Sequence, residues 1–362
     1  MNKTTDPSPA SARSAAGTPG FRDLPIPGPG DPAALAPVTD RQFIRDTLAR
    51  LEPSELPAIL DRLSAGNINA DRWESPDLLE QLRQAARRPA KAVVCGAIDL
   101  DPALPFMRTL AAERAMDIAA GAAALGKLAG TDRVILAVPE DMSPGGIAAL
   151  RSAADAAEIR LFPLAEEYPL AHPSLLIRRV TGRRLAPGKL PTEIGVVMLD
   201  APAAIAVGRF LVHGESMQRI PAGVYDGAAG RAHLVWTTAA ITLDSLLSAL
   251  KVSASSTELW AGHILRHVPI ARDAILGSAE LTFFASPPHA GEAAAACLRC
   301  GWCVEACPVN IHPAGLLDAA QLQDPALADA HGLRACIECG ICSYVCPSRL
   351  PLLQSIRGMR KQ

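Results

Sequence analysis

Eight of the nine cysteines of this chain lie between Cys297 and Cys346, in two groups of four. The first group reads Cys297-Leu-Arg-Cys300-Gly-Trp-Cys303-Val-Glu-Ala-Cys307-Pro, and the second reads Cys336-Ile-Glu-Cys339-Gly-Ile-Cys342-Ser-Tyr-Val-Cys346-Pro. Both follow the spacing C-x2-C-x2-C-x3-C-P, whose thiolates bind the irons of a [4Fe–4S] cluster in bacterial-type ferredoxins. Two such motifs predict two clusters, and the chemistry they predict is the transfer of single electrons.

The last cysteine of each motif is expected to bind the cluster of the other motif. A tight C-x2-C-x2-C loop wraps three thiolates around one face of a cluster, and the fourth cysteine, carried past a turn that proline ends, points to the neighbouring cluster. Crossed ligation of this kind holds two clusters close together and favours electron transfer between them. The predicted ligand sets are Cys297, Cys300, Cys303 and Cys346 for one cluster, and Cys336, Cys339, Cys342 and Cys307 for the other.

Structural zinc sites are the alternative, since four-cysteine zinc sites also use C-x2-C pairs. Zinc normally needs two cysteine pairs per site and has no use for a third cysteine three residues on, nor for the same twelve-residue pattern twice. The spacing therefore favours iron and sulfur. The ninth cysteine, Cys95, lies in the apolar run Ala92-Val-Val-Cys95-Gly and is predicted to be a buried strand residue without a redox role.

The residues around the ligands carry weaker signals. Apolar side chains between the cysteines are expected to form a jacket that excludes water from the clusters. The basic residues near the end of the chain are expected to be solvated, or to meet an acidic partner. The jacket consists of Leu298, Trp302, Val304, Ile337, Ile341, Tyr344 and Val345, and the basic residues are Arg349, Arg357, Arg360 and Lys361.

Length and composition bound the remaining possibilities. The chain has 362 residues, 35 Lys and Arg against 37 Asp and Glu, and 49% hydrophobic residues. This is enough for two or three domains with ordinary cores, and the near-neutral charge argues against a general nucleic-acid binder. The apolar runs are too short, or too interrupted by charge, to cross a bilayer, and the first thirty residues lack the apolar core of a secretory signal. We expect a cytoplasmic protein, with a peripheral position on the inner face of the cell membrane as the further expectation.

The elements that must position the cysteines form several segments. Residues 1–40 are crowded with Pro, Ala, Ser and Gly and are predicted to be a disordered lead. Residues 41–88 have the periodicity of short helices. Residues 89–215 alternate short β-branched runs with Ala-rich helical stretches, which predicts an α/β domain with a parallel sheet. Residues 216–288 resemble a small α+β module, and residues 289–362 hold the two cysteine motifs, with one helix between them.

The last two-thirds of the chain resembles the C subunit of the Rnf ion-translocating ferredoxin:NAD oxidoreductase. The strongest match runs from Leu333-Arg-Ala-Cys336 through Cys346-Pro-Ser-Arg-Leu-Pro351. Glu167-Tyr168-Pro169 and Leu190-Pro-Thr-Glu-Ile-Gly-Val-Val-Met198 are similar to the α/β domain of that family, and Val212-His-Gly-Glu-Ser-Met-Gln-Arg-Ile220 is similar to its β-grasp (SLBB-type) domain. The resemblance implies an α/β domain, a β-grasp module and a C-terminal helical two-cluster ferredoxin-type domain.

The chain also departs from that family. Members bind FMN through a glycine-rich loop. The corresponding region of this sequence, Leu56 to Glu80, contains a single glycine, Gly66. A backbone that approaches a phosphate closely needs glycines, so we expect no FMN site. The family's acidic segment is matched only by Cys95-Gly-Ala-Ile-Asp99-Leu-Asp101-Pro, where an Asx-turn that ends a strand is the alternative to a remnant cofactor site. The N-terminal barrel-like domain of the family has no counterpart in this sequence.

The resemblance and its departures predict a peripheral electron-transfer subunit of a larger, membrane-associated oxidoreductase rather than a complete enzyme. The expected cofactors are two [4Fe–4S] clusters without FMN. Other subunits of an electron-transfer complex, membrane-embedded ones included, and ferredoxin are the expected partners, and nucleic acid is not. Two alternatives remain: an active FMN-dependent NADH or ferredoxin oxidoreductase subunit that uses residues Asp99 to Pro102, and an iron–sulfur redox sensor or scaffold.

Overall fold

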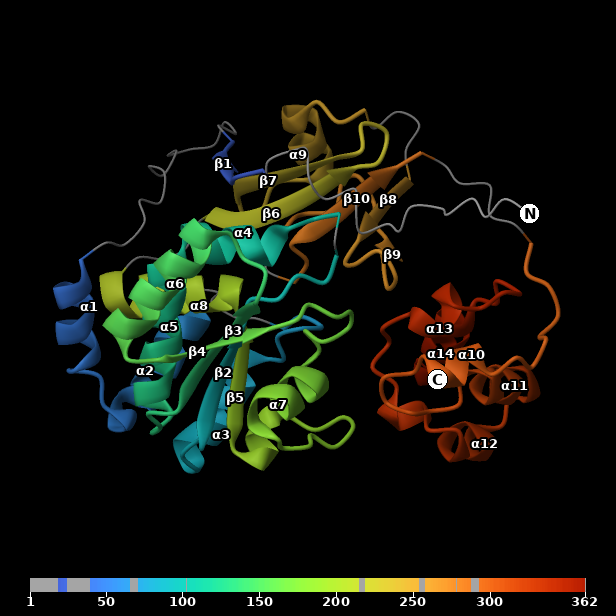
Figure 1. The fold of residues 1–362 in the computed structure, drawn as a ribbon, viewed down its shortest axis with the longest axis horizontal. Helices are drawn as coiled ribbons and strands as arrows, with labels where there is room; N and C mark the ends of the chain where they lie inside the picture. Colours follow the sequence, from blue (N-terminus) through green and yellow to red (C-terminus); the bar gives the residue numbers. More distant parts are fainter. Residues whose placement is uncertain are drawn as a thin grey trace, which may run out of the picture.

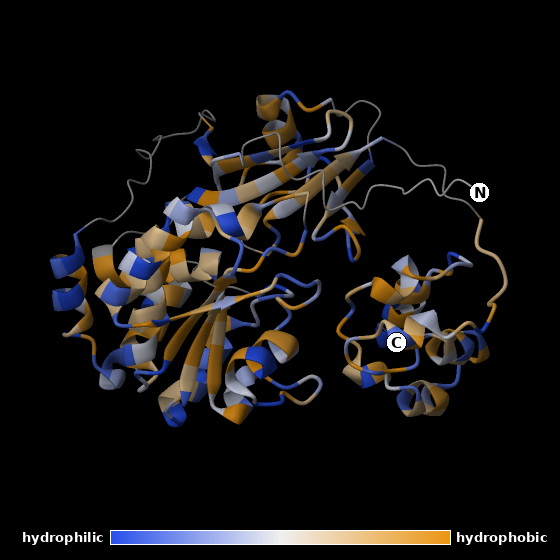
Figure 2. Cartoon of the chain, viewed as in Figure 1, coloured by the Kyte–Doolittle hydropathy of each residue, from blue (hydrophilic) through white to orange (hydrophobic). Residues whose placement is uncertain are grey.

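The computed structural model describes residues 19–24, 40–65, 71–101, 103–214, 219–253, 258–277, 279–287 and 293–361. Figure 1 shows a parallel sheet flanked by helices, a second sheet beside it, and a group of short helices formed by the end of the chain. In Figure 2 the strands of the parallel sheet are largely hydrophobic, and hydrophilic colour lies mainly on the outer helices and loops. This distribution is expected where a sheet is covered on both faces.

The first sheet has the strand order β4-β3-β2-β5, and every neighbouring pair is parallel. Its strands are β2 (Ala92–Gly96), β3 (Val134–Pro139), β4 (Arg160–Leu164) and β5 (Val196–Asp200). The helices that connect them are α4 (Phe106–Glu113), α5 (Ala115–Leu128), α6 (Pro144–Ala157) and α7 (Pro173–Thr181), and α8 (Ala201–His213) follows β5. The prediction of an α/β fold with a parallel sheet is confirmed.

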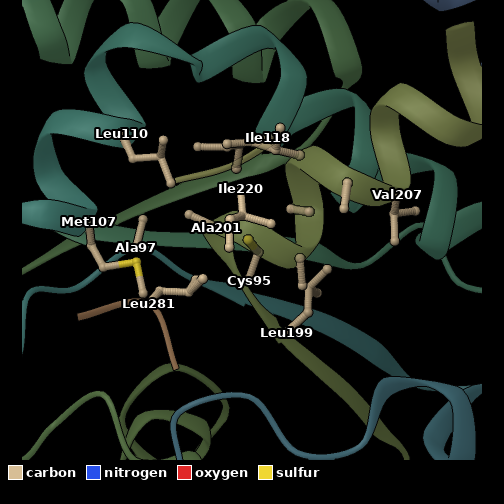
Figure 3. Packing of buried hydrophobic residues seen from close by; sticks show 14 of the residues in the cluster. Cys95, Ala97, Met107, Leu110, Ile118, Leu199, Ala201, Val207, Ile220 and Leu281 are labelled. Carbon is tan, nitrogen blue, oxygen red and sulfur yellow. The ribbon is translucent and has the colours of Figure 1, made fainter. Parts of the chain in front are cut away.

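Strand β2 lies in the middle of the sheet and is buried along its whole length. Successive side chains of a strand point to opposite faces. Val93 and Cys95 therefore join the larger core cluster, whereas Val94 joins the cluster under α7. Figure 3 shows the sulfur of Cys95 among apolar side chains that include Leu199, Ala201 and Ile220. Cys95 is fully buried in β2, which confirms the prediction of a buried strand cysteine, and burial raises the pKa of its thiol well above the usual range.

The helices around the parallel sheet begin at recognisable sequence features, and one Ala-rich stretch is interrupted. Helix α6 begins at the N-cap Ser143, which accepts a hydrogen bond from the backbone N–H of Gly146 at 3.2 Å. The Ala-rich stretch before β3 forms two helices, α4 and α5, because Arg114 leaves the helical conformation between them. Before the sheet lie α1 (Arg41–Leu48), α2 (Leu56–Ala65) and α3 (Leu78–Arg87), which agrees with the predicted short helices.

The second sheet is mixed and has the order β1-β7-β6-β10-β8-β9. Its members are β1 (Arg22–Asp23), β6 (Arg219–Asp226), β7 (Arg231–Thr238), β8 (Glu258–Ala261), β9 (Val268–Pro269) and β10 (Thr282–Ser286), with α9 (Leu243–Leu250) between β7 and β8. The core continues from the first sheet into the second, since Gly223 of β6 packs so closely on Leu104 and Phe106 that a Cβ there would lie 3.0–3.1 Å from their side chains.

Residues 19–24 of the predicted disordered lead have a defined structure. Residues 22–23 form β1, which pairs in parallel with β7, and the ring of Phe21 lies 5.6 Å from the rings of both Phe106 and Trp236. One aromatic side chain and one open strand edge are enough to order this short piece, which composition averaged over forty residues does not reveal. The rest of that segment, up to the residue that caps α1, lies outside the described residues.

The end of the chain forms α10 (Trp302–Glu305), α11 (Pro313–Leu322), α12 (Pro325–Ala330), α13 (Ile341–Tyr344) and α14 (Leu352–Arg360). These helices pack around a small core that contains Leu316, Leu352 and Ile356 together with Cys303 and Cys342. Within the described residues, no helix is both long enough and apolar enough to span a membrane.

Candidate metal centre

The two cysteine motifs have the same backbone conformation. Arg299 and Glu338, each just before the second cysteine of its motif, have φ values of 52° and 54°. Gly301 and Gly340, just after that cysteine, have φ values of 82° and 80° and begin α10 and α13. Left-handed residues at these two places turn the chain sharply around a centre, and the short helix then carries the third cysteine, Cys303 or Cys342.

Backbone amides point at cysteine sulfurs in both motifs. The N–H of Arg299 donates to Sγ of Cys297 at 3.4 Å, and the N–H of Glu338 donates to Sγ of Cys336 at 3.3 Å. Amides in this orientation stabilise negative charge on sulfur, as a metal-bound thiolate requires.

The fourth cysteine of each motif lies near the other motif. A small cavity is lined by Cys307 of the first motif together with Cys336, Cys339 and Cys342 of the second. Burial raises the pKa of Cys339 to about 11 and that of Cys342 to about 12, and the neighbouring Cys336 and Cys307 contribute in both cases. In the first motif, burial raises the pKa of Cys303, and Cys300 and Cys346 raise it further. Cys307 therefore lies with the thiols of the second motif, and Cys346 lies near those of the first.

These thiols are spread around a volume rather than gathered on one point. Among the described residues, no three His, Cys, Asp or Glu side chains converge closely enough to hold a single metal ion. In a cubane each of the four cysteines binds a different iron, so the sulfurs stand farther apart than the ligands of one zinc ion.

The two groups differ in exposure. Cys297 and Cys300 are exposed, whereas Cys339 and Cys342 are buried. The predicted apolar jacket exists only in part, because Leu298, Trp302 and Tyr344 are 69%, 55% and 74% exposed while Ile337 is buried. Leu298 and Trp302 of the first motif lie in solvent, whereas the loop of the second motif around Ile337 and Cys339 is packed against the rest of the protein and only Tyr344 of its apolar jacket is exposed.

The second motif is held by two side chains from segments that precede the cysteine domain. The indole Nε1–H of Trp73 donates to the carbonyl oxygen of Ile337 at 2.6 Å, and the hydroxyl of Tyr168 donates to the carbonyl oxygen of Cys339. Tyr168 belongs to the Glu-Tyr-Pro segment that the resemblance singled out. Trp73 was missed, since one tryptophan after a loop carries no sign of its partner.

The basic residues of α14 are bound within the protein, which differs from the solvated surface predicted for them. Arg357 and Arg360 reach the carboxylate of Glu338 at 3.0 and 2.8 Å. Arg357 also donates to the carbonyl oxygen of Arg266 at 2.8 Å, and Arg360 donates to that of Cys336 at 2.6 Å. Both guanidinium groups therefore fasten the loop of the second motif, because a planar fork can serve a carboxylate and a carbonyl together.

Trp73 lies at the carboxyl edge of the parallel sheet among ring side chains. Its ring centroid lies 4.8 Å from that of His172, 6.0 Å from that of His263 and 6.4 Å from that of Tyr168. The guanidinium of Arg266 stands 5.0 Å from the same centroid. These neighbours hold the indole between the sheet edge and the second motif.

An ion pair closes the same edge next to Trp73. The guanidinium of Arg72 binds the carboxylate of Asp200 with N–O distances of 2.7 and 2.5 Å, and both side chains are buried. Glu74 pairs with His263 at 3.6 Å; burial opposes ionisation of this carboxyl, but His263 and Arg72 lower the pKa of Glu74 to about 2. These charged groups satisfy one another within the protein.

Asp99 and Asp101, the residues left open as a remnant cofactor site, have structural partners. Asp99 accepts the backbone N–H of Met107 at the start of α4 and binds Arg108 at 3.0 Å. Asp101 accepts the N–H of Ala103 at 2.9 Å, which is an Asx-turn, and that of Ile264 at 3.2 Å. Burial and the nearby Glu166 raise the pKa of Asp99 to about 8.

A larger cavity of about 1060 Å³ opens between α7, the loop that follows it and the second motif. Its lining is rich in cationic side chains and includes Cys336. The basic residues are Arg72, Arg178, Arg184, Lys189, Arg266, Arg334 and Arg360, against Asp71, Glu280 and Glu338.

Comparison with known proteins agrees with both parts of this arrangement. Residues 296–351 match the 4Fe-4S dicluster domain, and residues 79–209 match the Nuo51 FMN-binding domain. The chain is 29% identical over 294 residues to the C subunit of the ion-translocating oxidoreductase complex of Haemophilus influenzae, an alignment that covers 76% of this chain and 34% of that protein. It is 28% identical over 313 residues to the protein of the same name from Edwardsiella ictaluri, covering 83% and 38%.

The chain is similar over most of its length to the C subunit of ion-translocating oxidoreductase complexes. The resemblance seen in the sequence is thereby confirmed, and the cysteine motifs match a 4Fe-4S dicluster domain. The chain spans 34–43% of the length of the relatives it matches first. Because residues 79–209 match an FMN-binding domain, the comparisons do not support the predicted absence of flavin, which stays a proposal.

Two solved structures are similar to this chain in fold. Two crystal structures of NAD+-reducing [NiFe]-hydrogenase, in the air-oxidized and H2-reduced states, superpose with TM-scores of 0.54 and 0.60. Each covers 90% of this chain, with 58% and 64% of the hydrogenase chain covered, at 14% and 15% identity. The likeness therefore concerns the fold.

Proposed function

We propose that the chain is a peripheral electron-transfer subunit of a larger, membrane-associated oxidoreductase, and that it passes single electrons through two [4Fe–4S] clusters without a flavin of its own. The observation that carries the proposal is the exchange of cysteines between two loops of the same backbone conformation, with Cys307 in the cavity of the second motif. Two clusters held in this way are close neighbours, as rapid exchange of electrons requires.

The residues fit two clusters in their ligand number, their spacing and their surroundings. The ligands would be Cys297, Cys300, Cys303 and Cys346 on the first cluster, and Cys336, Cys339, Cys342 and Cys307 on the second. Each cluster, when bound, accepts or gives one electron. The chain itself supplies the thiolates and the amides of Arg299 and Glu338, and it buries Cys339 and Cys342 of the second site.

The difference in exposure assigns the two clusters different roles. The first site has Cys297 and Cys300 at the surface, so an external redox partner can approach it. The second site is packed against Trp73 and Tyr168, so it exchanges electrons with an external partner through the first site. We propose that the partners are other subunits of the complex, membrane-embedded ones included, and ferredoxin.

The carboxyl edge of the parallel sheet, where α/β proteins of this type bind their ligands, supports the absence of FMN. The Arg72–Asp200 pair and Trp73 fill part of this edge, and a small cavity there is lined by Glu74, Asp99, Asp101, His263 and Glu280, apart from the larger cationic cavity that Arg72 and Trp73 also line. The carboxylate of Glu74, whose pKa is about 2, repels a phosphate, which instead needs backbone amides or cations. The eroded glycine-rich loop lies partly in residues 66–70, outside the described residues.

The proposal includes the domain organisation. A helical segment, 41–88, precedes an α/β domain, 89–215, a β-grasp SLBB-like module, 216–288, and the two-cluster domain, 289–362. Support for the β-grasp assignment comes from the pairing of β6 with β10 in parallel at the centre of a mixed sheet, with α9 in the connection. A cytoplasmic position on the inner face of the membrane is part of the proposal.

Chemical reduction tests the absence of a hydride-accepting cofactor. Anaerobically purified protein with full iron content is treated with NADH and, separately, with dithionite, and the visible absorption of the clusters is followed. We expect dithionite to bleach the absorption and NADH to leave it unchanged, because NADH delivers a hydride and the clusters take single electrons. Bleaching by NADH would contradict the flavin-free proposal.

A second candidate function is that of an FMN-dependent oxidoreductase subunit. The cationic cavity of about 1060 Å³ beside Cys336, together with the match of residues 79–209 to an FMN-binding domain, favours it. An anionic cofactor there would lie next to the second site. Bleaching by NADH that appears only after addition of FMN would support this candidate over the first.

A further inference from the structure

One peptide unit connects Trp73 to a cluster ligand. The carbonyl oxygen of Ile337 accepts the indole Nε1–H of Trp73 at 2.6 Å, and the amide of the same peptide, the N–H of Glu338, donates to Sγ of Cys336 at 3.3 Å. The indole, the peptide and the sulfur therefore form a chain of two hydrogen bonds in series.

Hydrogen bonds in series polarise one another. A donor on a carbonyl oxygen draws electron density from the peptide, so the N–H at its other end becomes a stronger donor. N–H···S bonds are one of the determinants of the reduction potential of an iron–sulfur cluster. A stronger bond favours the reduced state, which carries more negative charge, and so raises the potential.

Tyr168 acts on the next part of the same loop. Its hydroxyl donates to the carbonyl oxygen of Cys339, a second ligand of the same site. Tyr168 and Trp73 both come from segments that precede the cysteine domain, and their rings are stacked with 6.4 Å between the centroids. The loop of the second motif thus receives two donors from one preorganised surface.

The first motif provides an internal comparison. The N–H of Arg299 donates to Sγ of Cys297 at 3.4 Å, which corresponds to the bond from Glu338 to Cys336. The peptide that carries it joins Leu298 and Arg299 in an exposed stretch, where Leu298 is 69% exposed. Solvent, rather than an oriented indole, surrounds this part of the first motif.

We propose that Trp73 is a positioning residue that raises the reduction potential of the second cluster through the Ile337–Glu338 peptide, with Tyr168 acting in the same sense through the carbonyl of Cys339. The inference rests on the proposed function, from which it takes the ligands of that cluster. Its consequence is that an electron shared between the clusters is biased toward the buried one.

The test is a redox titration of the anaerobic full-length protein, followed by electron paramagnetic resonance. Dithionite supplies the electrons and is oxidised to sulfite, and each cluster takes one electron. In Trp73→Phe, which keeps an aromatic ring and removes the N–H, we expect one cluster to titrate at a lower potential while the other is unchanged, with both still present by iron content. Tyr168→Phe should lower the potential of the same cluster.

Matched controls come from the cysteine motifs. Trp302→Phe and Tyr344→Phe make the same chemical changes at side chains that are 55% and 74% exposed, and should leave both potentials at their wild-type values. A wild-type potential in Trp73→Phe with both clusters present would overturn the inference. If Trp73→Phe does not assemble the clusters, Tyr168→Phe decides in its place. Wild-type protein without iron, or with stoichiometric FMN, would instead contradict the proposed function.

Discussion

The α-carbon of Gly340 faces the backbone of Leu265 so closely that a Cβ on this glycine would lie 1.9 Å from the carbonyl oxygen of Leu265. The second cysteine motif therefore docks on the segment between β8 and β9 with backbone against backbone. Gly301, at the same place in the first motif, has a nearly identical φ but open space around it. The sequence shows two equivalent glycines, and the structure gives them different roles.

Alanine at these two positions separates backbone strain from steric exclusion. Gly301→Ala should cost about 1–2 kcal/mol from the left-handed conformation alone. Gly340→Ala should cost clearly more, and should loosen the second motif from the rest of the chain. Unfolding in urea and limited proteolysis between residues 287 and 340 measure the two effects. Equal losses of stability in both variants would show that the docking does not depend on this contact.

Replacing the fourth cysteine of each motif tests the crossed ligand sets. Cys346→Ser should remove the exposed first cluster, and Cys307→Ser should remove the buried second cluster, because each residue lies with the thiols of the other motif. The cluster that survives in Cys307→Ser should be lost quickly to an iron chelator, and the one that survives in Cys346→Ser slowly. Loss rates in the reverse order would indicate that each motif binds its own fourth cysteine.

The buried pair between Arg72 and Asp200 should contribute to stability in a way that surface pairs do not. Arg72→Met leaves the carboxylate of Asp200 buried without its cation, which typically costs about 3–5 kcal/mol. The control is Arg83→Met, which breaks an exposed pair with Glu80 at 3.3 Å and should cost far less, because solvent screens such a pair. Urea unfolding measures the free energy of unfolding of both variants. A loss in Arg72→Met as small as that in the control would show that the Arg72–Asp200 pair is not buried as described.

His172 should make stability depend on pH. Burial, and then the charge of Arg266, lower the pKa of His172 to about 4, from an ordinary value of 6.5. Between these values the unfolded chain binds more protons than the folded one, so the stabilisation is complete above about pH 6.5 and is lost as the pH falls toward 4.

The variant His172→Asn keeps a side-chain acceptor for the start of α7 and cannot titrate in this range. The stability difference between wild type and variant should therefore change with a slope that approaches about 1.4 kcal/mol per pH unit between pH 4 and 6.5. A difference independent of pH would show that His172 does not titrate as its surroundings indicate.

The parallel sheet, its helices and the cysteine loops follow from local patterns in the sequence. Cys95 could be placed in a buried strand because its apolar run is typical of a strand covered on both faces. The spacing within each motif predicts the repeated loop, since three thiolates, a glycine and a short helix are all set within a few residues.

Contacts between distant segments could not be predicted in this way. Trp73 and Ile337 are far apart in sequence, and neither shows a local sign of the other. Arg357 and Arg360 look like solvated basic residues until the fold brings the carboxylate of Glu338 to them. Phe21 lies in a segment whose composition indicates disorder, although its ring packs on Trp236. In each case a long-range contact overrides the local pattern.

The central claim, an electron-transfer subunit with two clusters and without flavin, is tested most directly by metal and cofactor analysis of one anaerobically purified sample. The account predicts about eight irons and about eight inorganic sulfides per chain, with FMN below stoichiometric amounts. Stoichiometric FMN, or iron replaced by two zinc ions per chain, would contradict it.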